Sequence, residues 1–187
     1  MEKGKIVIIS GPSGVGKTTI RKELFSDPSL NLAFSISMTT RKKRDNETNH
    51  IDYHFVNKDE FEKTIKEDKF LEYACFAQNY YGTLEEDVDK LLEKGLNVVL
   101  EIEIKGAKQI IDKRDDIISF FFMPPSFKEL KRRLVERKTD TKKAISKRLK
   151  RAKKEIKLAH LYNFTIINDD LNKAISEVKK ILKENNK

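Results

Sequence analysis

The residues with the clearest chemistry form a glycine-rich segment near the start of the sequence. It matches the pattern G-x-x-x-x-G-K-[S/T] at every fixed position, between a β-branched run and a helix-like stretch. Glycines let the backbone curl so that successive N–H groups point at phosphate oxygens, and the helix N-terminus adds partial positive charge. The segment therefore predicts a nucleoside triphosphate site, with Lys17 on the outer phosphates and the Thr18 hydroxyl on Mg²⁺. The residues predicted to bind ATP here are Gly11, Pro12, Ser13, Gly14, Val15, Gly16, Lys17 and Thr18.

This motif is shared by ATPases, GTPases and kinases, so a second site must supply the specificity. Residues 35–47 read SISMTTRKKRDNE, and residues 52–56 read DYHFV. Here the chain resembles the guanylate kinase family, whose acceptor lobe carries S-x-T-T-R-x-x-R-x-x-E followed by D-Y-x-F. Further matches occur in order at residues 70–73, 79–83, 105–107, 148–149 and 168–169. The resemblance extends from Lys5 to Asp170 and implies Mg²⁺-dependent transfer of the γ-phosphoryl group of ATP to GMP, giving ADP and GDP.

The resemblance also implies a set of acceptor-site residues. Arg41 and Arg44 would bind the GMP phosphate, because paired guanidinium groups bind a phosphate dianion bidentately. Glu72 and Thr83 would bind the guanine edge. Guanine presents N1–H and N2–H₂ side by side to a carboxylate, whereas adenine places a bare N1 lone pair there, and such sites discriminate by ~10⁴ or more. The implied GMP-binding residues are Ser37, Arg41, Arg44, Glu47, Tyr53, Glu72, Tyr81, Thr83, Glu101 and Glu103.

Two further groups follow from the resemblance. Arg137 and Arg148 match lid arginines, which would act with Lys17 and Arg41 as catalytic residues by neutralising charge on the moving phosphoryl group. No general base is required, because positioning and charge neutralisation supply most of this catalysis. Asn168 and Asp169 resemble the family's adenine-side contact, although an Asn-Asp turn also suits helix capping.

The run at residues 97–104, NVVLEIEI, departs from the family pattern. The family usually has two aspartates where this chain has Glu101 and Glu103, and a glutamine where it has Lys105. Burying a carboxylate on a central strand is unfavourable unless it is paired or close to a metal. Both glutamates are therefore candidates to face the GMP base or water bound to Mg²⁺, and the role of Lys105 is open.

Strand-like and helix-like segments alternate along most of the chain, which predicts an α/β fold with a doubly wound parallel sheet. Its strands are expected at 5–10, 32–38, 97–104, 117–123 and 164–167, and its helices at 17–25, 83–95, 105–113 and 171–183. Residues 34–86 interrupt this alternation with short strands at 52–56, 70–76 and 79–82 and a helix at 57–68. Helices at 126–137 and 141–160 flank a polar break.

These segments indicate one domain with the core of a P-loop nucleoside triphosphate hydrolase. We assign the core to residues 1–33, 87–125 and 157–187, an inserted GMP-binding lobe to 34–86, and a helical lid to 126–156. The 187 residues include one cysteine and no apolar run of the ~20 residues that a membrane helix needs. The first residues leave no room for a signal peptide before the strand pattern, so we expect a cytoplasmic protein.

Three other functions agree less well with the sequence. A net charge of +9 would suit a nucleic acid, but the lysines are scattered and we expect no nucleic-acid or membrane partner. A non-catalytic scaffold domain with this fold would typically lack Lys17, Thr18 and the lid arginines. Another nucleoside monophosphate kinase would lack the pairing of Glu72 with Thr83. The sequence leaves monomer and homodimer open.

Overall fold

The computed structural model describes residues 2–76, 78–136 and 141–185. In this part of the chain, five parallel strands form the central sheet in the order β2-β7-β1-β8-β9. The strands are β1 (Ile6–Ser10), β2 (Leu32–Phe34), β7 (Asn97–Glu101), β8 (Ile117–Met123) and β9 (Phe164–Ile167). All five residues of β1 are buried, as expected for a central strand that is covered on both faces.

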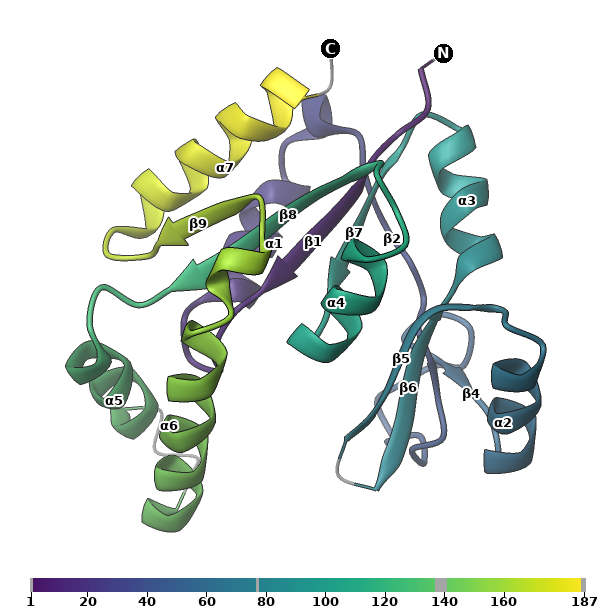
Figure 1. The fold of residues 1–187 in the computed structure, drawn as a ribbon, viewed down its shortest axis with the longest axis horizontal. Coiled ribbons are helices and arrows are strands. Elements are labelled where there is room, and N and C mark those ends of the chain that lie inside the picture. Colours follow the sequence, from purple (N-terminus) through teal and green to yellow (C-terminus); the bar gives the residue numbers. More distant parts are fainter. Residues whose placement is uncertain (1, 77, 137–140, 186–187) are drawn as a thin grey trace.

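Helices cover both faces of this sheet (Figure 1). Side chains from α1 (Lys17–Phe25) and α7 (Leu171–Asn185) pack with one face, and those from α3 (Glu85–Glu93) and α4 (Ile104–Ile111) pack with the other. Short 3₁₀ turns lie at η1 (Pro28–Leu30) and η2 (Ala159–Leu161). The predicted α/β core is therefore confirmed, and the residues that follow the strands meet at one edge of the sheet.

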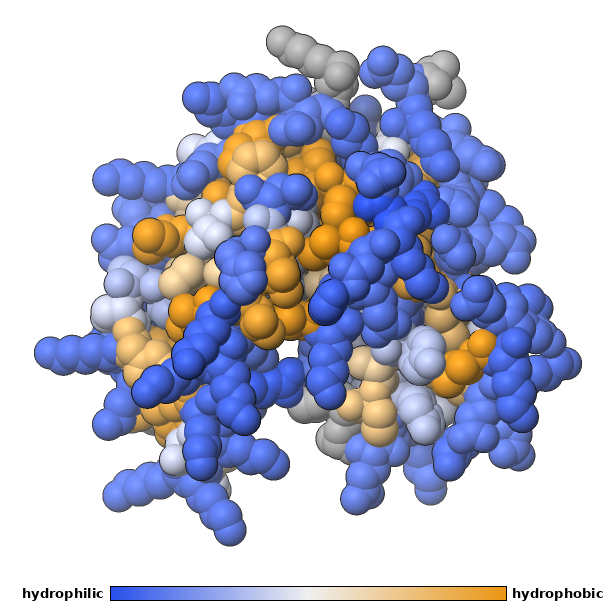
Figure 2. Space-filling view, in the orientation of Figure 1, coloured by the Kyte–Doolittle hydropathy of each residue, from blue (hydrophilic) through white to orange (hydrophobic). Residues whose placement is uncertain are grey.

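Two projections extend from that edge (Figure 1). One is a second sheet, with four described strands in the order β4-β3-β6-β5, together with α2 (Lys58–Lys66). Its strands are β3 (Met38–Thr39), β4 (His54–Phe55), β5 (Phe70–Phe76) and β6 (Asn79–Leu84). The other projection is the helix pair α5 (Phe127–Glu136) and α6 (Lys142–Ile156). Figure 2 shows the molecular surface hollowed between these two projections, with hydrophilic side chains on both.

Side chains cap several of the helices. The Asn57 side chain accepts a hydrogen bond from the Glu60 N–H at the start of α2, and Thr141 does the same for Ala144 at the start of α6. The Ser126 hydroxyl accepts from the Glu129 N–H, which is half of a capping box at the start of α5.

Three predicted boundaries of strands and helices were wrong, because contacts between distant parts of the chain decide where these elements begin and end. The strand expected at 32–38 is two strands, because Leu32–Phe34 pairs with β7 whereas Met38–Thr39 pairs with β4 and β6. Thr83 lies in β6 and α3 begins two residues later. The strand expected at 97–104 ends at Glu101, and Glu103 is the N-cap residue of α4. Alternating E-I-E-I at 101–104 resembles a strand, but Ile104 begins the helix that packs on the sheet.

The predicted domain limits place residue 34 in the inserted lobe. Phe34 instead pairs with Val99 in the central sheet, so the connection between the two sheets is residues 35–37. The second sheet spans Met38 to Leu84. The helix predicted at 141–160 ends at Ile156, before the separate turn η2.

Candidate active site

The glycine-rich loop joins β1 to α1 and requires glycine at two places. Gly11 has φ 142°, and a Cβ there would lie 2.4 Å from the Phe122 carbonyl oxygen. Gly16 has φ 102°, and a Cβ there would lie 2.5 Å from Asn168 Nδ2. Both positions therefore combine a left-handed backbone with a close neighbour, which excludes any larger residue. The motif thus has the curled backbone that its composition predicts.

Lys17 and the first turn of α1 supply positive charge at this loop. The N-cap residue of α1 is Gly16, which has no side chain to cap the helix, and the partial positive charge of a helix N-terminus attracts an anion. Lys17 Nζ donates to the carbonyl oxygens of Gly11 (2.6 Å) and Pro12 (3.2 Å). The ammonium group therefore lies over the mouth of the loop, where the outer phosphates of a nucleotide would replace these carbonyl contacts.

Asn168 supports this loop from behind. Its side chain is buried, and Nδ2 donates to the Val15 carbonyl oxygen at 2.7 Å. The Asn168 carbonyl oxygen accepts from Arg133 Nη2 at 3.0 Å. Its amide is thus committed to the phosphate loop, while the neighbouring Asp169 is exposed and Asp170 caps α7 by accepting from the Lys173 N–H.

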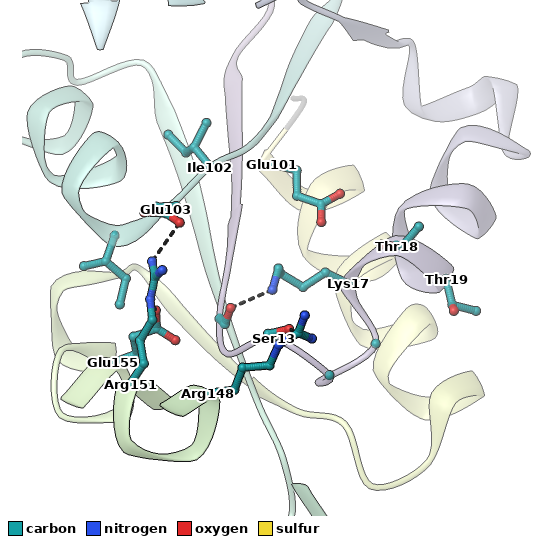
Figure 3. Close-up of a pocket in the computed structure, with 14 residues that line it drawn as sticks. Ser13, Lys17, Thr18, Thr19, Glu101, Ile102, Glu103, Arg148, Arg151 and Glu155 are labelled. Atoms are coloured by element: carbon teal, nitrogen blue, oxygen red, sulfur yellow. Dashed lines mark hydrogen bonds and ion pairs between the residues drawn. The ribbon is translucent and has the colours of Figure 1, made fainter. Parts of the chain in front are cut away.

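A cavity of about 420 Å³ opens in front of the loop (Figure 3). Thr18 and Lys17 line it from α1, and Arg148 lines it from α6. Arg148 Nη1 donates to Ser13 Oγ at 3.2 Å, so α6 contacts the glycine-rich loop directly. The remaining lining residues are Gly11, Ser13, Gly14, Gly16, Thr19, Glu101, Ile102, Glu103, Ile104, Arg151 and Glu155.

Glu101 and Glu103 line this cavity, and each carboxylate forms an ion pair with an arginine. Glu101 lies 3.2 Å from Arg21 of α1, and Glu103 lies 2.7 Å from Arg151 of α6. Arg21 also lies over the Phe34 ring, 4.9 Å from its centroid. Each carboxylate is therefore neutralised by an arginine, which explains why both are tolerated next to the sheet.

A second cavity of about 200 Å³ lies on the other side of the same two carboxylates. Its lining residues are Ser37, Tyr53, Glu72, Ala74, Tyr81, Gly82, Glu101, Ile102 and Glu103. A third, of about 360 Å³, reaches from Thr18 and Arg21 to Ser37 and Tyr53. Glu101 and Ile102 line all three, so the predicted triphosphate and acceptor sites share one wall.

Glu72 is the buried acid of the second cavity. The residue is 6% exposed, and its Oε1 accepts from Thr83 Oγ1 at 2.7 Å. A Cβ on Gly106 would lie 2.2 Å from Glu72 Oε2, so only glycine leaves room for the carboxylate. Burial raises the pKa of Glu72 to about 7, opposed by the Thr83 hydrogen bond and assisted by repulsion from Glu103. The structure thus brings together the two residues predicted for the guanine edge.

The two arginines predicted to bind the acceptor phosphate lie outside the three cavities. Arg41 donates from Nη1 and Nη2 to the two carboxylate oxygens of Glu47, at 3.0 and 2.7 Å. The Arg41 guanidinium lowers the pKa of Glu47 and lies 5.5 Å from the ring centroid of Tyr53, which lines the cavity. Arg44 is exposed and uses its backbone N–H to hold Glu47. Neither arginine lines the three cavities, and Glu47 contacts Arg41.

Three further points concern Arg137, metal binding and membrane helices. Arg137 lies outside the described residues. Among the described residues, no group of three His, Cys, Asp or Glu side chains is placed to hold a metal ion. No helix in the described ranges is long and apolar enough to cross a membrane.

Sequence reasoning gave no role to Arg21, Gly106 or Arg151. Gly106 did carry a signal, because glycine inside a helix is unfavourable and indicates a close neighbour. Arg21 and Arg151 carried none, since their partners are 80 and 48 residues away in the sequence.

Known proteins resemble this chain over nearly its whole length. A sequence profile described as "Guanylate kinase" matches residues 3–185. The chain belongs to the guanylate kinase family. A guanylate kinase of Malacoplasma penetrans (strain HF-2) is 50% identical over 185 residues, which cover 98% of this chain and 94% of the relative. The expected family and the kinase class of enzyme are thereby confirmed.

Solved structures agree with this family. The crystal structure of guanylate kinase from Anaplasma phagocytophilum has a TM-score of 0.75 and 30% identity, and the match covers 98% of this chain and 86% of that one. The SH3-kinase fragment of tight junction protein 3 matches with a TM-score of 0.54 and 17% identity, covering 100% of this chain and 59% of that one. This second likeness shows a shared fold alone.

Proposed function

We propose that the chain transfers the γ-phosphoryl group of ATP to GMP in a Mg²⁺-dependent reaction, giving ADP and GDP. One observation carries this proposal: the cavity at the phosphate loop and the cavity that holds Glu72 share the wall formed by Glu101, Ile102 and Glu103. Two nucleotides bound in these cavities would have their phosphate groups on the same side of the molecule, as direct transfer requires.

On the donor side, the backbone of the glycine-rich loop and Lys17 would hold the β- and γ-phosphates of ATP. Arg148, which already contacts Ser13, would neutralise charge on the equatorial oxygens of the moving group. A phosphate oxygen of GMP forms a bond to the γ-phosphorus, while the bond from that phosphorus to the β–γ bridging oxygen breaks and leaves ADP. Positioning and charge neutralisation would carry this step without a general base.

The donor set at the phosphate loop fits Mg²⁺. Thr18 presents a hydroxyl oxygen in the first turn of α1, in the same cavity as Lys17. Mg²⁺ prefers oxygen ligands and keeps several waters beside substrate phosphates, so it needs few protein ligands. When bound there with ATP, it would neutralise negative charge on the phosphates. Thr18 is the residue that we propose to hold it.

On the acceptor side, ionised Glu72 would accept from guanine N1–H and N2–H₂. Thr83 holds the Glu72 carboxylate from β6, so its position does not depend on the ligand. Adenine would place its N1 lone pair against the same oxygens, and the buried carboxylate would then lose its donors. This arrangement supports GMP as the acceptor.

Closure of the two projections is part of the proposal, because Arg41 and Arg44 lie outside the three cavities. Arg41 is preoriented by Glu47 and lies against Tyr53, so a small approach of the second sheet would bring it toward the phosphate of GMP. We assign this sheet to GMP binding and the α5–α6 pair to a lid that excludes water from the transfer. We further propose small-molecule substrates only and a cytoplasmic enzyme that acts as a monomer or homodimer.

The test is direct. The protein is mixed with Mg·ATP and, separately, with GMP, AMP, CMP and UMP, and ADP release is followed. We expect turnover with GMP and little with the others. Preference for another acceptor would refute the guanine site, and absence of turnover with all four would refute the enzyme.

A further inference from the structure

The lid helix α6 is attached to the wall between the two cavities by a chain of three charged side chains. Arg151 Nη2 lies 2.7 Å from Glu103 Oε1, and Arg151 Nε donates to Glu155 Oε1 at 2.7 Å. Glu155 follows Arg151 by one helical turn, so it orients the guanidinium along α6. Figure 3 shows Arg151 reaching from α6 to Glu103 at the start of α4.

The same face of α6 carries Arg148. Residues three apart lie side by side on a helix, so Arg148 and Arg151 point to the same side of α6. Arg148 contacts Ser13 of the phosphate loop, and Arg151 contacts Glu103 at the opposite wall of the cavity. These two contacts tie one face of α6 to both walls of the cavity, in addition to the packing of Ala152 of α6 in one apolar cluster with residues of α5.

We propose that Arg151 is a positioning residue, which binds Glu103 and thereby holds α6 so that Arg148 faces the phosphate loop. This inference rests on the proposed function, in which Arg148 neutralises charge during transfer. Exposed ion pairs add little to stability, and the Arg151 and Glu103 side chains are 45% and 40% exposed. The pair is therefore suited to orientation and contributes little to the free energy of unfolding.

The length of Glu103 is part of the inference. Glutamate stands here where the family resemblance leads us to expect aspartate, and its extra methylene extends the carboxylate toward α6. Glu103 also lines the cavity of Glu72. The longer side chain therefore connects α6 to the wall of the acceptor site. An aspartate at this position would reach Arg151 less well.

The experiment is a double-mutant cycle on kcat, in four proteins: native, Arg151→Ala, Arg148→Ala and the double variant. We expect Arg151→Ala to lower kcat about three- to fivefold, because an exposed ion pair holds the helix only weakly, while KM for ATP and for GMP changes less than about twofold. In the Arg148→Ala background, the same substitution is expected to change kcat less than about twofold. Lys150→Ala, on the exposed side of α6, is the matched control and should behave as native.

Three outcomes would overturn the inference. They are unchanged kcat in Arg151→Ala, an equal loss of kcat in both backgrounds, and a rise confined to KM for ATP, which would make Arg151 a direct ligand. If the native protein does not phosphorylate GMP, the proposed function fails instead, so the two failures are distinguishable.

Glu103→Asp tests the reach of the carboxylate without removing its charge. We expect it to lower kcat in the native background and to have little further effect in Arg151→Ala. A full additional loss in that background would show that Glu103 acts independently of α6 and would contradict the inference. The melting temperatures of these variants should match that of the native protein, since the pair is exposed.

Discussion

The phosphate loop and the Glu72 cavity differ in how far apart their residues lie in the sequence. The motif occupies eight consecutive residues, six between β1 and α1 and two at the start of α1, and its proposed binding groups are mostly backbone N–H groups and one lysine. The Glu72 cavity draws on β5, β6, the end of β7 and the residues between the two sheets. One site is therefore local in the sequence, whereas the other exists only after two sheets have been placed together.

Their electrostatics differ as well. The loop offers positive charge to an anion, and Lys17 is held over it by carbonyl oxygens. The acceptor cavity buries a carboxylate whose pKa is raised to about 7 by burial. In the proposed function, charge recognition at the loop is strong but unselective, while the buried acid selects among bases. The two sites should consequently respond to mutation in separable ways.

The largest expected effect concerns the loop. Lys17→Ala should lower kcat by roughly 10³-fold or more, because it removes the side chain proposed to hold the outer phosphates during transfer. Steady-state assays with Mg·ATP and GMP measure this, and Lys22→Ala, on the exposed side of α1, is the matched control. Near-native turnover of Lys17→Ala would remove the loop from the mechanism.

Glu72→Gln should affect the acceptor alone. We expect kcat/KM for GMP to fall by about 10²-fold or more, because the amide presents a donor where guanine also presents donors. Affinity for ATP, measured by calorimetry, should change less than threefold. The exposed Glu60→Gln on α2 is the control in the same lobe. Equal losses for the two nucleotides would contradict the separation of the sites.

Gly106→Ala should give a smaller effect of the same kind. Alanine stabilises a helix interior, but its Cβ here would displace the Glu72 carboxylate. We expect about tenfold weaker GMP binding with ATP binding unchanged, and no further loss when the substitution is combined with Glu72→Gln. Calorimetric titrations of both nucleotides test it. Native affinity for GMP would show that Glu72 does not need its present position.

The last expected effect is on stability and depends on pH. The pKa of Glu72 in the folded protein is raised to about 7 from an ordinary value of 4.5. The stability that Glu72 contributes in its protonated form is thus complete below about pH 4.5 and is lost as the pH rises through about 7. Above pH 7, Glu72→Gln should therefore be more stable than the native protein, by on the order of 1–3 kcal/mol.

Urea unfolding of both proteins at pH 4.5 and pH 8 measures this difference. We expect the gap between them to close at the lower pH. A gap of the same size at both pH values would mean that ionisation of Glu72 is not its source.

Much of the core could be read from the residues. Strands β1, β8 and β9 and helix α1 were predicted within a residue, because continuous β-branched runs and the glycine-rich loop leave few alternatives. The division of residues 32–38 between two sheets was missed, since an alternating pattern shows that a strand exists without showing its partner. Glu103 was placed on a strand for the same reason.

The sequence by itself determined the phosphate loop, the family and the identity of the paired residues Glu72 and Thr83. These depend on local spacing or on motifs that can be recognised in the sequence alone. Only the tertiary structure decided that Glu101 pairs with Arg21, that Glu103 pairs with Arg151, and that Gly106 leaves space for a carboxylate. The physical reason is that charge neutralisation and close packing act over a few ångströms in space, between residues that the chain separates widely.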